Sequence, residues 1–138
     1  MFSYWTATLD LLEQHLKARS ISYLRIDGNV TNTARLRILE DFRDKDAPVL
    51  LMTVGTGAVG SATFHQTFPQ VFRLKLLITR LNLTVANYVH IVEPQWNPAV
   101  EEQAIARALR MGQSRPVTVV RYVVKNSIEE VSRTCPHA

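Results

Sequence analysis

Residues 88–113 read YVHIVEPQWNPAVEEQAIARALRMGQ, a stretch that combines a strand pattern, a loop and a helix pattern. YVHIVE (88–93) has the β-branched and aromatic content of a strand. Asn97 before Pro98 is typical of a helix start, because the amide oxygen can cap the first turn and proline suits the first helical position. We therefore expect a helix from Pro98 to about Arg110.

The alternation of strands and helices continues on both sides of this stretch. After it, VTVVRYVV (117–124) is a strand pattern, and Ser127 and Glu130 have the spacing of a capping box for a terminal helix. Before it, apolar spacing predicts two helices and two strands, at 6–19, 21–26, 33–42 and 49–53. This order predicts an α/β fold with three layers, a parallel sheet covered by helices on both faces.

Length and composition describe an ordinary globular chain. A chain of 138 residues with 46% hydrophobic content can form one domain, over residues 1–138, that removes roughly 70% of its unfolded surface from water. Cys135 is the single cysteine, so an internal disulfide is impossible, and we expect a soluble, intracellular protein without a metal site. No leader pattern and no apolar run of membrane-spanning length is present, so no membrane contact is expected.

The positive charge is concentrated in two stretches without acidic residues. The net charge is +4 and the pI is about 9.6, which favours a polyanionic partner. One stretch is 103–125; the other, 61–80, contains Arg73, Lys75 and Arg80, and without it the net charge falls to +1. The charge alone is weak support for nucleic-acid binding.

Residues 61–80 do not fit the surrounding pattern. They hold three of the five phenylalanines and separate the glycine-rich loop at 54–60 from the LNLT stretch at 81–84 that looks like its continuation. We interpret 61–80 as an insertion.

The glycine-rich loop allows a dinucleotide-binding hypothesis. Gly55, Gly57 and Gly60 have the GxGxxG spacing that lets a backbone approach a pyrophosphate. The confirming acidic residue is missing between Gly60 and Glu93, whereas Arg80 could meet a 2′-phosphate, so an NADP-binding domain remains an alternative. A tight turn without a ligand is the simpler interpretation.

Gln103, Arg107 and Arg110 lie at positions i, i+4 and i+7 of the expected helix. Two guanidinium groups on one face repel each other unless an anion lies opposite. The γ-phosphate of ATP is a suitable anion. A solvated basic face explains the spacing equally well.

Five blocks in this order resemble a known family: FSYWTATLDLLEQHL, YLRIDGNVTNTARLRILEDF, VLLMTVGTGAVG, LNLTVANYVHIVEPQWNPAVEEQAIARALRMGQ and VTVVRYVVKNSIEE. Together they resemble the C-terminal RecA-like lobe of Swi/Snf-type helicase-like ATPases of superfamily two, in the repair-associated branch. The resemblance implies a nuclear DNA-dependent ATPase that translocates on double-stranded DNA. Its cofactor would be ATP, with Mg²⁺ held mainly by the N-terminal RecA-like lobe, which is a partner outside this sequence.

The resemblance also implies roles for individual residues. Arg107 and Arg110 match the arginines of motif six, with Arg110 as the arginine finger, and Gln103 opens that motif. The cofactor-binding set is Gly57, Gly60, Arg107 and Arg110. The DNA-binding set comes from motifs four and five and comprises Asp27, Gly28, Arg35, Thr53 and Asn82. A purely structural turn at Asp27-Gly28 is equally compatible.

Departures from the family pattern lead to further expectations. In the family, motif five couples the ATP cleft to the DNA backbone. The insertion places this coupling in doubt, because it separates Gly60 from Leu81. Met1 lies inside the expected first strand, so we expect the sheet to lose that strand. No GxxxxGK[ST] sequence is present, and we expect the isolated chain to lack ATPase activity. A non-catalytic module that binds DNA or a partner ATPase lobe is the alternative from another functional class.

Overall fold

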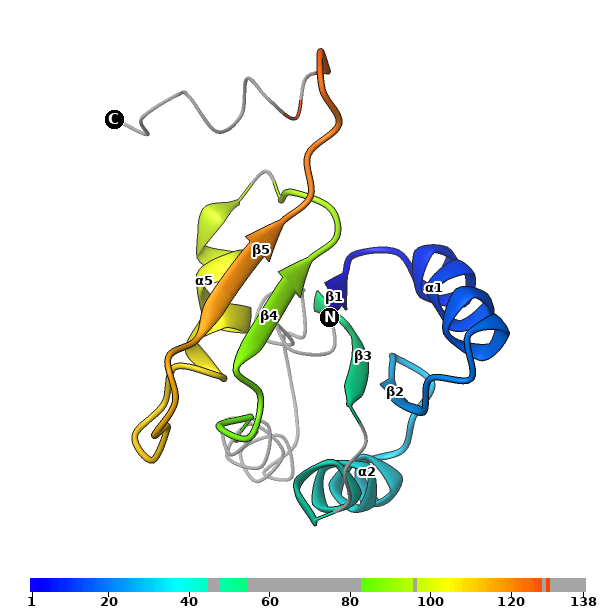
Figure 1. Cartoon of the computed structure of the whole chain (residues 1–138), viewed down its shortest axis with the longest axis vertical. Helices are drawn as coiled ribbons and strands as arrows, with labels where there is room; N and C mark the ends of the chain where they lie inside the picture. The colour runs from blue at the N-terminus through cyan, green and yellow to red at the C-terminus, as the bar shows by residue number, and fades with distance from the viewer. Residues whose placement is uncertain (45–47, 55–82, 96, 128, 130–138) are drawn as a thin grey trace, which may run out of the picture.

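The computed structural model describes residues 1–44, 48–54, 83–95, 97–127 and 129, and the segment 61–80 therefore lies outside the described residues. Strands and helices alternate along the chain (Figure 1). The elements are β1 (Phe2–Ser3), α1 (Thr6–Ala18), β2 (Tyr23–Ile26), α2 (Asn32–Asp44), β3 (Val49–Thr53), β4 (Tyr88–Ile91), α5 (Pro98–Ala106) and β5 (Thr118–Arg121).

The strands form one parallel sheet in the order β2-β3-β1-β4-β5. The predicted parallel α/β architecture is therefore confirmed. The expected loss of the first strand is corrected, because β1 remains as a two-residue strand at the centre of the sheet. Phe2 pairs with Met52 on one side and with Ile91 on the other, so β1 joins the two halves of the sheet.

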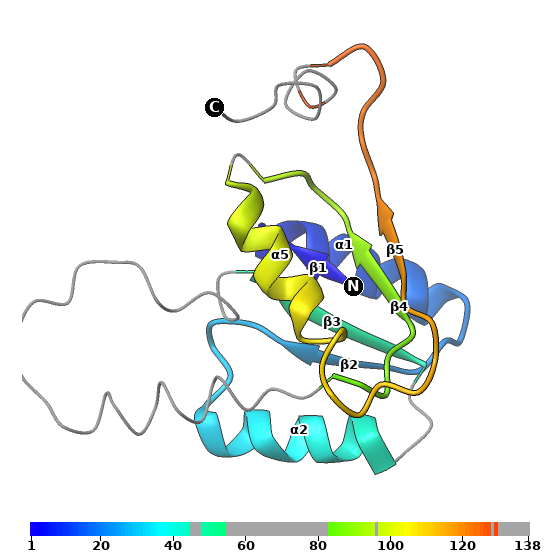
Figure 2. The same cartoon turned by 90° about the vertical axis from the view of Figure 1, so that its left-hand side faces the viewer.

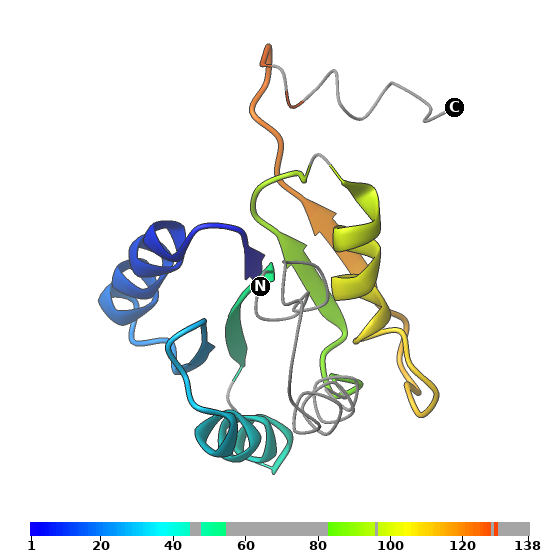
Figure 3. The same ribbon diagram turned by 180° about the vertical axis from the view of Figure 1, so that it is seen from behind.

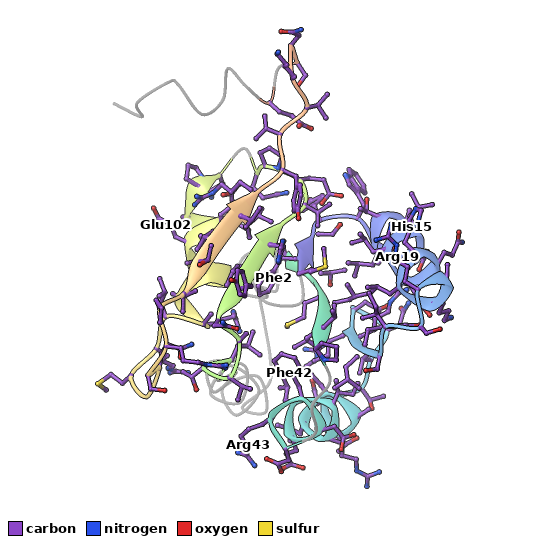
Figure 4. The ribbon with its side chains drawn as sticks, in the orientation of Figure 1. Phe2, His15, Arg19, Phe42, Arg43 and Glu102 are labelled. Carbon is purple, nitrogen blue, oxygen red and sulfur yellow. The ribbon has the colours of Figure 1, made fainter. Side chains whose placement is uncertain are left out.

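Helices cover both faces of the sheet, as predicted. On one face, Phe42 of α2 and Ile105 of α5 share a core with Phe2 and alternate residues of β3 and β4. Figure 4 shows Phe2 near the middle of the sheet and Phe42 on α2. On the other face α1 packs on β1 and β3, where Leu9 and Leu51 are fully buried. Accordingly, α1 and α5 lie on opposite sides of the sheet in Figures 1 and 3.

The two halves of the sheet are covered unequally. Figure 2 shows α2 alongside β2 and β3, and α1 packs mainly on β1 and β3. On the α1 side of β4, Tyr88 is 58% exposed, and its ring stacks in a row with those of His90 and Tyr122. The described residues thus leave the β4–β5 half open on one face.

The predicted start of α5 is confirmed, but its predicted end is wrong. The Asn97 side chain accepts a hydrogen bond from the Ala99 N–H at 3.0 Å, and Pro98 occupies the first turn. The helix ends at Ala106 instead of continuing to Arg110, and Arg107 is its C-cap. The Arg107 carbonyl accepts a hydrogen bond from the Leu83 N–H at 3.1 Å. This contact with a distant segment directs the chain away from the helix axis.

The capping prediction after β5 is partly confirmed. Ser127 Oγ accepts a hydrogen bond from the Glu129 N–H at 3.2 Å, as a capping serine does. A carboxylate reaches back to the Val124 N–H at 2.9 Å, but it belongs to Glu129. Glu130, the predicted partner, lies outside the described residues.

Candidate functional site

The predicted DNA-contacting residues gather where strands of the sheet end. Asp27 and Gly28 follow β2, and Thr53 is the last residue of β3. Ile26 lies opposite Met52 in the parallel pair, so both strands end at the same edge. Parallel α/β sheets bind ligands at this carboxyl edge. Asp27, Gly28 and Thr53 are therefore brought together at this edge, although Thr53 itself is buried.

Asp27 builds the turn after β2 with its own side chain. Its Oδ1 accepts a hydrogen bond from the Asn29 N–H at 2.9 Å, and its Oδ2 accepts one from Arg25 Nε at 2.9 Å. The carboxylate is buried and faces the turn. A Cβ added at Gly28 would meet no atom within 4 Å, so the outer side of the turn is open. The sequence allowed a purely structural role for Asp27, and its carboxylate does hold the turn through these two bonds.

Arg25 is a residue that sequence reasoning missed. Its Nη1 donates to Asp10 at 2.6 Å and to Glu13 at 2.8 Å, both on α1, while its Nε binds Asp27. Burial lowers the pKa of Arg25, and the bonds to the three carboxylates raise it further than burial lowers it. Arg25 therefore ties helix α1 to the turn after β2. No local pattern reveals it, because two of its partners are 12 and 15 residues away.

Arg35 points inward, under the same turn. Only 9% of the residue is exposed, and its Nη2 donates to the carbonyls of Asp27 at 3.3 Å and Val30 at 3.4 Å. Its Nε is buried without a hydrogen-bond partner in the part of the chain that the structure describes. These bonds hold the backbone of residues 27–31 from beneath. We call residues 27–31 the acidic turn.

Glu93 closes the same edge on the other side of β1. Its Oε1 accepts a hydrogen bond from Ser3 Oγ at 3.0 Å, and its Oε2 accepts one from the Tyr4 N–H at 3.0 Å. Ser3 Oγ also accepts a hydrogen bond from the Trp5 N–H at 3.1 Å. The carboxylate thereby joins the end of β4 to the segment that leads into α1. Sequence reasoning assigned no role to Glu93.

Glu101 orients the first turn of α5. It is almost fully buried, its Oε1 accepts a hydrogen bond from the Gln95 N–H at 2.8 Å, and its Oε2 binds Arg121 Nε of β5 at 2.8 Å. A carboxylate is also favourable at this end of a helix, where unpaired N–H groups carry partial positive charge. Glu101 belongs to the EEQA block that carries the family resemblance, and that block is the signal that could have identified it.

The predicted catalytic residues lie on and just after α5. Gln103 is exposed on the helix, Arg107 is half-buried at its C-cap, and Arg110 is exposed three residues later. Burial and the neighbouring Arg110 charge lower the pKa of Arg107. The sequence placed both arginines on one face of the helix, but Arg107 is its C-cap and Arg110 lies beyond its end. Such a pair suits an anion that carries several negative charges.

Hydrogen bonds to the carbonyls of Val85 and Ala86 hold the segment that carries the two arginines. We call residues 107–117 the arginine loop. Gln113 uses both ends of its amide: Nε2 donates to the Ala86 carbonyl at 2.9 Å, and Oε1 accepts from the Arg115 N–H at 3.0 Å. Arg115 also donates to the Val85 carbonyl. The loop is thus attached to residues 83–87, and Gln113, which closes the RMGQ block, is a further residue that sequence reasoning missed.

The structure separates the predicted site residues into two groups. Asp27, Gly28, Arg35 and Thr53 lie at the carboxyl edge. Arg107 and Arg110 lie near the start of β4, because the Arg107 carbonyl binds the Leu83 N–H. The remaining predictions, Gly57, Gly60 and Asn82, lie outside the described residues, as do Gly55 and Arg80 of the NADP alternative.

A cavity of about 390 Å³ lies at the amino edge of the sheet, beside the arginine loop. Its inner wall is apolar and comes from both halves of the sheet and from α2, with Phe2, Phe42, Leu50 and Val89. Ala108 and Arg115 of the arginine loop reach its rim. Arg43 and His90 also line the cavity, so its wall is not apolar throughout.

Within the described part of the chain, no helix is long and apolar enough to cross a bilayer. The same residues contain no cluster of three or more His, Cys, Asp and Glu side chains that could hold a metal ion.

Known proteins match this chain over nearly its whole length. The family described as the helicase conserved C-terminal domain matches residues 1–112. DNA repair protein RAD5B of Arabidopsis thaliana is 41% identical over 131 residues, which cover 94% of this chain and 9% of that protein. DNA repair protein rad8 of Schizosaccharomyces pombe is 37% identical over 131 residues, which cover 94% of this chain and 10% of that protein.

A solved structure leads to the same family. The crystal structure of the C-terminal part of the Fun30 ATPase domain matches with a TM-score of 0.75 and 30% identity, over 96% of this chain and 37% of that one. The chain spans about a tenth of the length of the curated relatives. The resemblance to the C-terminal lobe of Swi/Snf-type proteins is confirmed. Because the family match extends over residues 1–112, this chain belongs to the family of the helicase conserved C-terminal domain.

Proposed function

We propose that the chain acts as the C-terminal lobe of a DNA-dependent ATPase and translocase in DNA repair or chromatin remodelling. The observation that carries this proposal is the pair of neighbouring guanidinium groups at the end of α5. Arg107 is half-buried, and burial and Arg110 together lower its pKa. An approaching polyphosphate would relieve that repulsion. Relatives named as DNA repair proteins support the assignment to repair and, with it, to the nucleus.

The arginine loop supplies the chemistry expected of this lobe. When ATP and Mg²⁺ are bound by a Walker-bearing partner lobe, the reaction is transfer of the γ-phosphoryl group to water. Guanidinium groups bind the non-bridging phosphate oxygens while negative charge shifts toward the leaving group. In our proposal Arg110, which is exposed, enters the partner's ATP site. Arg107, which is half-buried, lies farther from the phosphates. Gln103 assists from the preceding turn of α5.

DNA contact is proposed at the carboxyl edge. The open space at Gly28 would let a phosphate approach the backbone of the acidic turn, a kind of contact that is independent of base sequence. The N–H groups of Asn29 and Val30 already bind Asp27, so they shape the turn. Asp27 and Arg35 position this backbone from within, through the bonds to Asn29, Val30 and Arg25. Thr53 and Asn82 complete the proposed DNA-binding set.

Family membership favours ATP over NADP as the nucleotide. The sequence has no GxxxxGK[ST] pattern, so we propose that hydrolysis requires the partner lobe. In this scheme the chain contributes the arginines and the DNA contact, and the partner binds most of the nucleotide.

A fusion of the full chain to a Walker-bearing lobe of a Swi/Snf-type ATPase tests this proposal. We expect ATP hydrolysis that duplex DNA stimulates, and a loss of about 10³-fold or more in Arg110→Ala. Arg110→Lys keeps the charge but loses the forked geometry and should recover only part of the rate. Arg19→Ala, on the exposed end of α1, is the matched control and should leave the rate unchanged. Full activity of Arg110→Ala contradicts the proposal.

The second candidate is a non-catalytic module that binds DNA or a partner ATPase lobe. Its support is the series of exposed cations that follow α5 in the sequence, with Arg110 and Arg115 before β5 and Lys125 after it. Under this alternative the fusion does not hydrolyse ATP, yet the chain binds duplex DNA with an affinity that falls as salt rises, because phosphate contacts release counterions.

A further inference from the structure

The turn that carries Arg110 projects from the rest of the arginine loop. Leu109 is 57% exposed and Met111 is 97% exposed, so apolar packing does not hold the residues on either side of Arg110. Ala108, two residues before Arg110, is almost fully buried and belongs to the core. Packing therefore fixes the chain as far as Ala108, and another kind of contact must hold it beyond that point.

The backbone of Gln113 holds the far side of this turn. The Gln113 N–H donates a hydrogen bond to the Arg110 carbonyl at 3.1 Å, which closes the turn over Met111 and Gly112. Gly112 has a φ of 105°, a conformation that glycine adopts more easily than residues with a side chain. The backbone of Arg110 is therefore held relative to the backbone of Gln113.

The side chain of Gln113 connects this turn to a distant part of the chain. Its Nε2 donates to the Ala86 carbonyl at 2.9 Å, across 27 positions of sequence, and its Oε1 accepts a hydrogen bond from the Arg115 N–H at 3.0 Å. Ala86 lies two residues before β4 and packs against the core. Both ends of the amide are thus used, and they join the turn to the sheet.

We propose that Gln113 is a positioning residue for Arg110. Through its bonds to the carbonyls of Ala86 and Arg110 it sets the place from which the guanidinium group reaches the phosphates. This inference rests on the proposed function and identifies a residue that the reaction requires although it does not touch the nucleotide. A misplacement of about 1 Å can cost about 100-fold in rate. Because Ala108 and Arg115 still hold the loop without the amide, we expect a smaller loss, of about tenfold.

The first measurement separates kcat from KM. It uses the fusion of the full chain to a Walker-bearing lobe, with duplex DNA at saturation. Gln113→Met keeps the side-chain length and removes both bonds of the amide. We expect kcat to fall about tenfold and KM for ATP to stay within about twofold, because the partner lobe binds most of the nucleotide. Gln14→Met, at an exposed position of α1, is the matched control and should leave both constants unchanged.

A double-mutant cycle with Arg110 separates positioning from stability. If Gln113 acts through Arg110, Gln113→Met should lower the rate less than about twofold once Arg110→Ala has removed the guanidinium group. Single turnovers with the fusion in excess measure these slow rates. A purely structural loss would multiply with the loss in Arg110→Ala, because it lowers the amount of active protein in either background.

Gln113→Glu tests the bond to Ala86 by itself. A carboxylate can accept from the Arg115 N–H but cannot donate to the Ala86 carbonyl, so kcat should fall as in Gln113→Met. Thermal unfolding shows whether each variant is folded at the assay temperature. Full kcat in either Gln113 variant, or a loss that multiplies with that of Arg110→Ala, overturns the inference. A fusion without hydrolysis, or one in which Arg110→Ala stays fully active, overturns the proposed function itself.

Discussion

The acidic turn and the arginine loop are held by different kinds of interaction. Beside the acidic turn, Arg25 of β2 binds Asp27 of the turn and Asp10 and Glu13 of α1, so charged side chains neutralise one another there. The arginine loop is attached through the neutral amide of Gln113 and through the bond from Arg115 to the Val85 carbonyl. The two loops should therefore respond differently to the loss of an ion pair and to the loss of an amide.

Arg25→Met should give the largest loss of stability. The substitution leaves the buried carboxylate of Asp27 without its cation, at a cost of about 2 kcal/mol. Urea unfolding of the two proteins measures the change. Combining Arg25→Met with Asp27→Asn should restore part of the loss, because the unpaired charge at position 27 is removed. Equal stability of the single variant and the unchanged protein would show that the charges do not hold the acidic turn.

Gln113→Met should have a smaller effect, about 1 kcal/mol. The change preserves side-chain length and charge but removes the bonds to the Ala86 carbonyl and the Arg115 N–H. Unlike the loss at Arg25, this loss should be independent of added salt, because no ion pair is broken. Parallel urea titrations at low and high sodium chloride measure both. Gln14→Met, at an exposed position of α1, is the control. A salt-dependent loss at position 113 would contradict the distinction between the two loops.

Glu13 of α1 should account for part of the pH dependence of the protein's stability. Hydrogen bonds from Lys17, and then from Tyr23 and Arg25, lower the pKa of Glu13 from 4.5 to about 2. A lowered acid pKa in the folded state gives stability that is complete above pH 4.5 and is lost as the pH falls toward 2. Urea midpoints between these values should therefore fall less steeply in Glu13→Gln. If the urea midpoint changes equally with pH in both proteins, Glu13 does not contribute to the pH dependence of stability.

Lys17→Met should have the smallest effect, below about 0.5 kcal/mol. Lys17 and Glu13 form an exposed i,i+4 pair at 2.7 Å on α1, and solvent screens such pairs. Thermal unfolding at low ionic strength is the measurement. A loss as large as that in Arg25→Met would mean that the surface pair, and not the Arg25 cluster, supports the acidic turn.

Local chemistry explains the elements that the sequence predicted well. Asn97 and Pro98 mark the start of α5, since a capping amide and a proline act on their own first turn. The apolar run 49–53 became a buried parallel strand for a similarly local reason. The end of α5 was predicted too late, because a hydrogen bond from Leu83, far away in the sequence, competes with helix continuation at Arg107.

The candidate site was predictable in its residue types and only partly in its geometry. The spacing predicted Arg107 and Arg110 on one helical face, whereas α5 ends at Ala106 and Arg110 lies beyond the helix. The inward direction of Arg35 did not follow from spacing, because its partners are carbonyls of the acidic turn. Arg25 and Gln113 were missed, since their partners come from elements distant in the sequence.

Periodicity, caps and ordered motifs were sufficient to establish a parallel α/β fold and its family, because these signals depend on neighbours within a few residues. Only the folded chain decided that two residues of β1 suffice to join the halves of the sheet. It also decided that one loop is held by ion pairs and the other by an amide. The physical reason is that such contacts form between segments that meet only after the strands pair, and no short window of sequence contains both partners.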